Sequence, residues 1–142
     1  MPIAAIICVF LIALTTLIHY EVLRAISFYL KSLPIPNRTK LLVVVYGSFF
    51  AHALEIAVYG LSIFALHSYA QLGSLVSSTP TSLTTCLYFS AETFTSLGFG
   101  DITPTGPLRL LAGFEALNGL LLIGWSASFT YIAMERFWKD PK

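Results

Sequence analysis

The chain has 142 residues, of which 56% are hydrophobic and 11% are charged, and its formal net charge is +1. A soluble domain usually carries about 25% charged residues, and a mean hydropathy of +0.80 implies more apolar surface than a small core can bury. The composition therefore predicts a membrane protein. The near-neutral charge gives no indication of a nucleic-acid partner. The two cysteines, Cys8 and Cys86, have no spacing typical of a metal site or a disulfide framework.

Three segments are long and apolar enough to cross a bilayer, which takes about 20 helical residues. They are residues 3–30, 41–67 and 108–134. A signal peptide is the alternative for the first segment. No basic region precedes that segment, however, and no small-residue cleavage site follows it before Arg24. We therefore expect three transmembrane helices.

The basic residues predict the orientation of these helices. Those of the first connection and of the C-terminus fall on one side of a three-span protein: Lys31, Arg38, Lys40, Arg136, Lys139 and Lys142. Only Arg109 lies near the other side. The positive-inside rule then predicts a multi-pass protein of the plasma or inner membrane, with its N-terminus outside and its C-terminus in the cytoplasm.

Residues 68–107 are too polar to span a membrane and too poor in charge for a soluble domain. The run Ser77-Ser78-Thr79-Pro80 is typical of a helix start, because a hydroxyl can cap the helix and proline fits its first turn. We expect a helix over residues 80–95, which is too short to cross the bilayer and would enter it from outside.

The segment Ser96-Leu97-Gly98-Phe99-Gly100 follows this helix. Alternating glycines permit positive φ angles. If successive peptides alternate their twist, every carbonyl can point toward one axis, and Ser96 can add its hydroxyl as the innermost ring. Four copies would then form stacked oxygen rings that replace the hydration shell of a cation. The alternative is a glycine-rich extracellular turn between two helices.

The run from Tyr88 to Pro104 resembles the pore helix and selectivity filter of tetrameric potassium channels, the pore-loop family. Their common form is an aromatic pair, then S-x-E-T-x-T-T-V-G-Y-G-D and a proline. The resemblance implies that residues 97–100 take the place of V-G-Y-G. It implies K+ sites at Ser96, Leu97, Gly98 and Phe99. It also implies that five residues support the filter. Tyr88 and Phe89 would form an aromatic cuff, Glu92 and Asp101 an acidic pair behind the filter, and Thr95 would be a further supporting residue.

The chain departs from this pattern at Ser96 and Phe99. Serine keeps the threonine hydroxyl but loses a methyl group, and phenylalanine lacks the tyrosine hydroxyl that bonds the cuff. A weakly selective monovalent cation channel is therefore one alternative, and a non-conducting regulatory or scaffold subunit is another. If Glu92 and Asp101 approach as the resemblance implies, we expect them to share a proton, which links filter stability to external pH.

Two glycines of the third span, Gly119 and Gly124, are candidates for a gating hinge. The alternative is that they allow helices to pack closely, as small residues do in membranes. Glu115 lies about two turns into the same span, and we expect it to face the bundle interior or water rather than lipid.

The first span is additional to what a pore needs. His19 and His52 each lie about a dozen residues from the first connection, so at about 1.5 Å per residue they reach similar depth in an antiparallel pair. Glu55 shares a face with His52, and Glu21 and Arg24 are also three residues apart. These residues form a candidate intramembrane polar cluster. It either bonds the first helix to the second or is a titratable or metal-binding site of His19, His52 and Glu55.

The expected fold is thus an all-α membrane protein with three transmembrane helices and a re-entrant pore helix, assembling as a homotetramer. Residues 1–37 are the additional helix and a cytoplasmic loop, and residues 38–142 are the pore domain. We expect no enzymatic activity and no cofactor, with K+ as the permeant ion and lipid as the surroundings. No soluble partner and no soluble regulatory domain is indicated.

Overall fold

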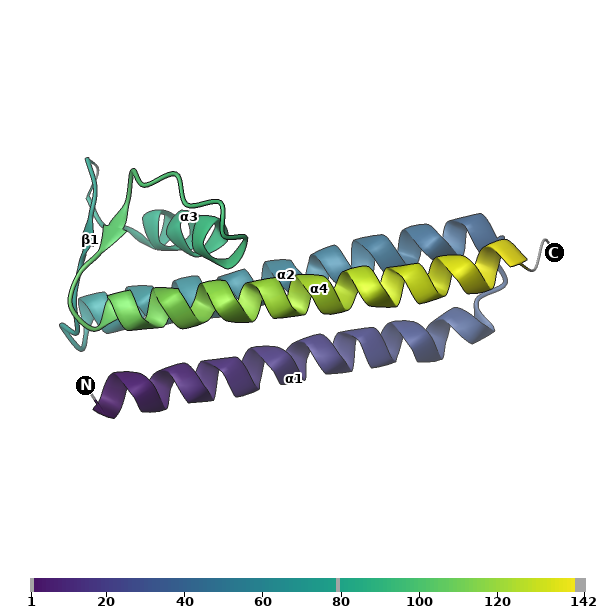
Figure 1. Ribbon diagram of the computed structural model, residues 1–142, viewed down its shortest axis with the longest axis horizontal. Helices are drawn as coiled ribbons and strands as arrows, with labels where there is room; N and C mark the ends of the chain where they lie inside the picture. Colours follow the sequence, from purple (N-terminus) through teal and green to yellow (C-terminus); the bar gives the residue numbers. More distant parts are fainter. Residues whose placement is uncertain (1, 79, 140–142) are drawn as a thin grey trace.

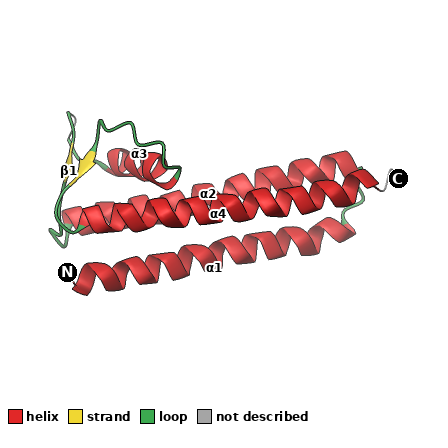
Figure 2. Ribbon diagram, in the orientation of Figure 1, coloured by secondary structure: helices red, strands yellow, loops and turns green. Residues whose placement is uncertain are grey.

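The computed structural model describes residues 2–78 and 80–139. Three long helices, α1 (Pro2–Ser32), α2 (Asn37–Ser68) and α4 (Leu108–Lys139), lie side by side, and the short helix α3 (Leu83–Phe94) packs at one end of them (Figure 1). The three long helices are long and apolar enough to cross a membrane. The predicted all-α fold with three such helices is confirmed (Figure 2). Thr79, in the expected helix start, and Lys142, used for orientation, lie outside the described residues.

Side-chain exposure matches the hydropathy of the long helices. Large apolar side chains remain exposed on each of them, for example Ile6 on α1, Phe49 on α2 and Leu121 on α4. Burying such surface is favourable by about 25 cal/mol per Å², so these faces require a lipid or protein neighbour. The helical structure is interrupted between α1 and α2 by Pro34 and Pro36, because proline lacks the backbone N–H that a helix interior needs.

Helix α3 begins later than the sequence predicted. Its N-cap is Ser82, whose hydroxyl accepts a hydrogen bond from the Thr85 backbone N–H at 3.1 Å. The helix therefore starts at Leu83 rather than at residue 80, and Pro80 precedes the cap instead of filling the first turn. Its 12 residues are too few to cross a bilayer.

A two-stranded sheet that the sequence did not predict joins the segments on either side of α3. β1 (Leu75–Val76) pairs antiparallel with β2 (Thr103–Pro104). The pairing continues next to the strands, where the Thr105 N–H donates to the Ser74 carbonyl at 2.8 Å. These bonds close the base of the loop that contains α3 and residues 96–100, called the filter segment below.

Two glycines allow α3 to approach its neighbours closely. A Cβ at Gly60 of α2 would lie 3.0 Å from the Leu87 Cα. A Cβ at Gly119 of α4 would overlap the backbone carbonyl oxygen of Phe94, the last residue of α3. Gly124, by contrast, has open space around its Cβ position. The close approach at Gly119 supports the packing role that the sequence offered as an alternative to a hinge.

We expect Gly119→Ala to destabilise the protein, because the added methyl group forces α3 away from α4. Overpacking of this kind costs about 1–3 kcal/mol, more than the higher helix propensity of alanine returns. Thermal unfolding of the purified protein in detergent measures the effect, with Gly124→Ala as the control variant. A Gly119→Ala protein that melts no lower than the wild type would contradict the packing role.

Candidate ion-conducting site

The end of α3 turns the chain out of the helix. The Ser96 N–H donates to the Thr93 carbonyl at 2.9 Å, and the Leu97 N–H donates to the Glu92 carbonyl at 2.8 Å. This pair of bonds is the Schellman arrangement, which places a left-handed residue after the helix. Here that residue is Ser96, with φ of 57°, where glycine is usual. The filter segment thus leaves α3 with its first N–H groups already bonded.

The filter segment has an alternating backbone. Ser96, Gly98 and Gly100 have φ angles of 57°, 55° and 80°, whereas the intervening Leu97 and Phe99 are not among the positive-φ residues. The sequence predicted this alternation from the two glycines but did not predict that Ser96 would share it. Leu97 and Phe99 are 60% and 67% exposed, and a Cβ at Gly98 would meet no atom within 4 Å. In a single chain, the segment is therefore uncovered.

The residues predicted to support the filter occupy different environments. Phe89 is buried in the hydrophobic core, whereas Tyr88 is 41% exposed and lines a shallow surface pocket together with Asp101. The Thr95 hydroxyl donates to the Ala91 carbonyl at 2.8 Å, within its own helix. The expected aromatic cuff therefore divides within one chain, with Phe89 facing the core and Tyr88 facing outward.

Glu92 lies on the buried side of α3, and its side chain is close enough to Asp101 for the two carboxyl groups to interact. Burial, and then the negative charge of Asp101, raise the pKa of Glu92, while the Phe99 backbone N–H opposes this effect. Among the described residues, the buried Oε2 atom of Glu92 has no hydrogen-bond partner. A carboxyl group in these surroundings favours its neutral form.

A buried hydroxyl connects α3 to two long helices. The Ser90 Oγ lies 2.9 Å from the Ile56 carbonyl of α2 and 2.5 Å from Glu115 Oε1 of α4. Glu115 is completely buried, so the expectation that it faces the bundle interior is confirmed. Ser90 could not be recognised as its partner beforehand, because serine is common in helices without such a role.

A second group of polar contacts connects α1 to α2 and α4. Asn118 of α4 donates to the Thr15 hydroxyl of α1 at 2.8 Å and to the Tyr59 hydroxyl of α2 at 3.2 Å. Neither Thr15 nor Tyr59 was among the residues predicted to make polar contacts between helices. The available signal was that Thr15 lies four residues before His19 and therefore on the same face of α1.

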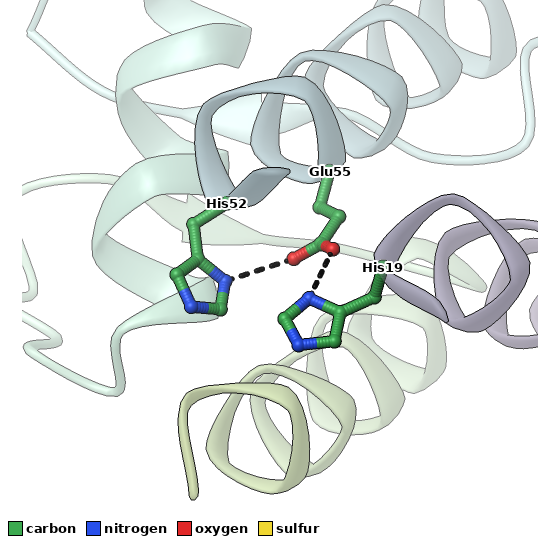
Figure 3. A group of neighbouring side chains, drawn as sticks. All are labelled: His19, His52 and Glu55. Carbon is green, nitrogen blue, oxygen red and sulfur yellow. Dashed lines mark hydrogen bonds and ion pairs between the residues drawn. The ribbon is translucent and has the colours of Figure 1, made fainter. Parts of the chain in front are cut away.

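Three of the five residues of the candidate polar cluster meet (Figure 3). The Glu55 carboxylate lies between two imidazoles, with Oε1 2.8 Å from His19 Nδ1 and Oε2 2.9 Å from His52 Nδ1. His19 and Glu55 are fully buried. Glu21 and Arg24 instead form a separate exposed pair on α1 at 3.2 Å. The two histidines thus lie at similar depth, as predicted, and their rings are neighbours, with centroids 5.2 Å apart.

Comparison with known proteins identifies the class of protein. Residues 39–136 match the family described as "Ion channel". The chain belongs to this ion-channel family, and the resemblance found in the sequence is confirmed. With its three apolar helices it is a multi-pass membrane channel protein, not an enzyme. All of α1 lies outside the matched region.

The chain is similar to the inward rectifier potassium channel Kirbac3.1 of Paramagnetospirillum magnetotacticum. The two sequences are 35% identical over 77 residues, which cover 53% of this chain and 26% of that relative. The chain thus matches about a quarter of the relative's length. No solved structure matches this chain.

We expect the folded protein to lose stability as the pH rises above the ordinary carboxyl pKa of 4.5 toward the raised pKa of Glu92. In that window the unfolded chain has released the proton that the folded protein retains, so each further rise in pH favours unfolding. Thermal unfolding between pH 4 and pH 8 measures the slope. Glu92→Gln should flatten it. An unchanged slope in Glu92→Gln would show that Glu92 does not carry the effect.

Proposed function

We propose that this chain is a subunit of a homotetrameric, potassium-selective channel that conducts K+ passively through the backbone carbonyls of residues 96–100. The observation that carries the proposal is the alternation of positive φ at Ser96, Gly98 and Gly100, in a chain that belongs to the ion-channel family. The similarity to a relative named as a potassium channel supports K+ as the permeant ion, bound at Ser96, Leu97, Gly98 and Phe99.

The exposure of the filter segment supports a homotetramer. Non-helical backbone at membrane depth is tolerated only where it is buried in protein or lines a water-filled cavity. In one chain this segment is uncovered, since Leu97 and Phe99 are mostly exposed. Four copies around an axis would cover the side chains and leave the carbonyl oxygens facing the ion path. The exposed apolar faces of the long helices would contact lipid or neighbouring copies.

The polarity of α3 supports a cation path. The C-terminal end of a helix carries a partial negative charge of about half an electron. The filter segment leaves from this end of α3 and returns to β2 (Figure 1). In the proposed tetramer, four such ends would lower the energy of a cation below the filter.

The position of the termini supports the proposed orientation. The start of α1 and the end of α4 lie at opposite ends of the bundle, and the connection from α1 to α2 lies at the end where α4 stops (Figure 1). Lys31, Lys40 and Arg136 line a cavity at that end. We assign this end to the cytoplasm and the N-terminus to the outside of the plasma or inner membrane.

Of the two glycines proposed as a gating hinge, Gly124 is the better candidate. Gly119 is occupied in packing against the Phe94 carbonyl, whereas Gly124 has room around it. α4 passes through both positions as one continuous helix. Bending of α4 at Gly124 would move the part of the helix that follows Gly124 without separating α3 from α4.

Ser96 and Phe99 favour one alternative, a weakly selective cation channel with the same architecture. The serine hydroxyl is less restricted than that of threonine, and the Phe99 side chain has no hydroxyl for a bond to the aromatic cuff. A non-conducting subunit would have no need for the alternating backbone. Discrimination between K+ and Na+ therefore separates the main proposal from this alternative.

The proposal predicts that Gly98→Ala strongly reduces K+ flux. Alanine at φ of 55° costs about 1–2 kcal/mol, which corresponds to a loss of about 5- to 30-fold in the population of the conducting backbone. Efflux of K+ from liposomes containing the purified protein measures this, with the oligomeric mass measured in parallel. Gly113→Ala, at an open helical position, is the matched control.

We expect the wild type and Gly113→Ala to release K+, and Gly98→Ala to remain tetrameric with little release. Absence of K+ efflux from wild-type liposomes would overturn the proposal. Undiminished efflux through Gly98→Ala would exclude the filter segment as the conducting path.

A further inference from the structure

We propose that His19, His52 and Glu55 form a binding site for one divalent transition-metal ion of the Zn2+ type, which joins α1 to α2. The ligand atoms that these three residues offer all lie within 4.8 Å of one another. They come from two helices, with His19 on α1 and the other two residues on α2 (Figure 3). The site is distinct from the filter and goes beyond ion conduction.

The spacing of the ligand atoms suits a small ion. Zinc binds imidazole nitrogen and carboxylate oxygen at about 2.0–2.2 Å, so two ligands of a tetrahedral ion lie about 3.3 Å apart. The present separations are 2.8 Å for His19 Nδ1 to Glu55 and 2.9 Å for His52 Nδ1 to Glu55. These two contacts must therefore open by a few tenths of an ångström to admit the ion, and the widest ligand separation, within 4.8 Å, must close by up to about 1.5 Å.

The donor set determines the class of ion. Imidazole nitrogen suits Zn2+ and neighbouring transition metals, whereas K+, Mg2+ and Ca2+ prefer sites built from oxygen. Two imidazoles and one carboxylate leave a fourth position for water, as in sites where zinc has three protein ligands. The permeant cation of the filter is thus not the ion that this site would bind.

Charge also favours a cation here. Glu55 is fully buried, and its ion-pair partners among the described residues are the two histidines, His19 and His52. A buried carboxylate without a countercharge is costly. Imidazoles bind a metal in their neutral form, so in the bound state the positive charge beside Glu55 would come from the divalent ion, and the carboxylate would offset half of it.

The surroundings can hold the tautomer that metal binding requires. When Nδ1 of His19 binds a metal, its proton must reside on Nε2. That atom lies 3.4 Å from the Ser126 Oγ of α4, which can accept the resulting hydrogen bond. Such outer partners fix the orientation of a ligating imidazole. His52 is the partly exposed member, with 17% of its side chain accessible, and provides the route of entry.

The site would connect the additional helix to the pore. The ring of His52 lies 5.8 Å from that of Phe94, the last residue of α3. An ion held by His19 and His52 would therefore fix α1 beside the end of the pore helix. The whole of α1 lies outside the region that matches the ion-channel family, and the ion would give it a specific attachment to that region.

Metal stoichiometry tests the proposal on the full-length protein. The chain has three histidines, and the third, His67, lies elsewhere, with Nδ1 3.2 Å from the Gly73 carbonyl. After chelator washing, incubation with Zn2+ and gel filtration, we expect about one Zn2+ per chain in the wild type and in His67→Gln. His19→Gln, His52→Gln and Glu55→Gln should retain little. No retained zinc in the wild type, or full retention in these three variants, would overturn the proposal.

A second measurement needs no change in the cluster. Of the two tryptophans, Trp125 has its ring 5.2 Å from that of His19. In a Trp138→Phe background, Co2+ bound at the site should quench most of the Trp125 fluorescence and produce visible absorption typical of four or five ligands. Unchanged fluorescence at saturating Co2+ would contradict the site even if the histidine variants fail to fold. Neither measurement depends on K+ conduction, so this proposal and the channel function can fail separately.

Discussion

The peptide groups of residues 96–100 impose the constraint on which the rest of the structure depends. They leave helical geometry between two membrane-crossing helices, where unsatisfied backbone groups are costly. Bonds to Thr93 and Glu92 satisfy the first N–H groups of the segment. The remaining structure keeps α3 in place, through the close approach at Gly119 and the Ser90 contacts to α2 and α4. Small residues and buried hydroxyls near α3 are therefore as important as the filter residues themselves.

Much of this fold could be predicted from the sequence, because hydropathy over about 20 residues reports directly on membrane crossing. The alternating backbone was predicted in part, since glycine signals positive φ but Ser96 does not. The strand pair of β1 and β2 was missed because two-residue strands have no periodicity to detect. The start of α3 was misplaced because several hydroxyl residues precede it and any of them could cap.

The polar cluster shows what a single sequence can and cannot specify. Helical rise fixes depth, so the similar depth of His19 and His52 could be anticipated, whereas the contact of their rings could not. The rotation of each helix about its own axis is set by packing against its neighbours. In α1 this rotation exposes Glu21 and Arg24, and in α2 it buries Glu55. The contact of Asn118 with Thr15 was unpredictable for the same reason, as the residues are 103 positions apart.

The proposal that carbonyl rings built from residues 96–100 select K+ can be tested by the reversal potential of single-channel currents, with K+ on one side of a bilayer and Na+ on the other. A potassium-selective filter gives a reversal potential displaced strongly from zero, in the direction expected when K+ carries nearly all of the current. A reversal potential close to zero would contradict potassium selectivity and favour a weakly selective cation pore.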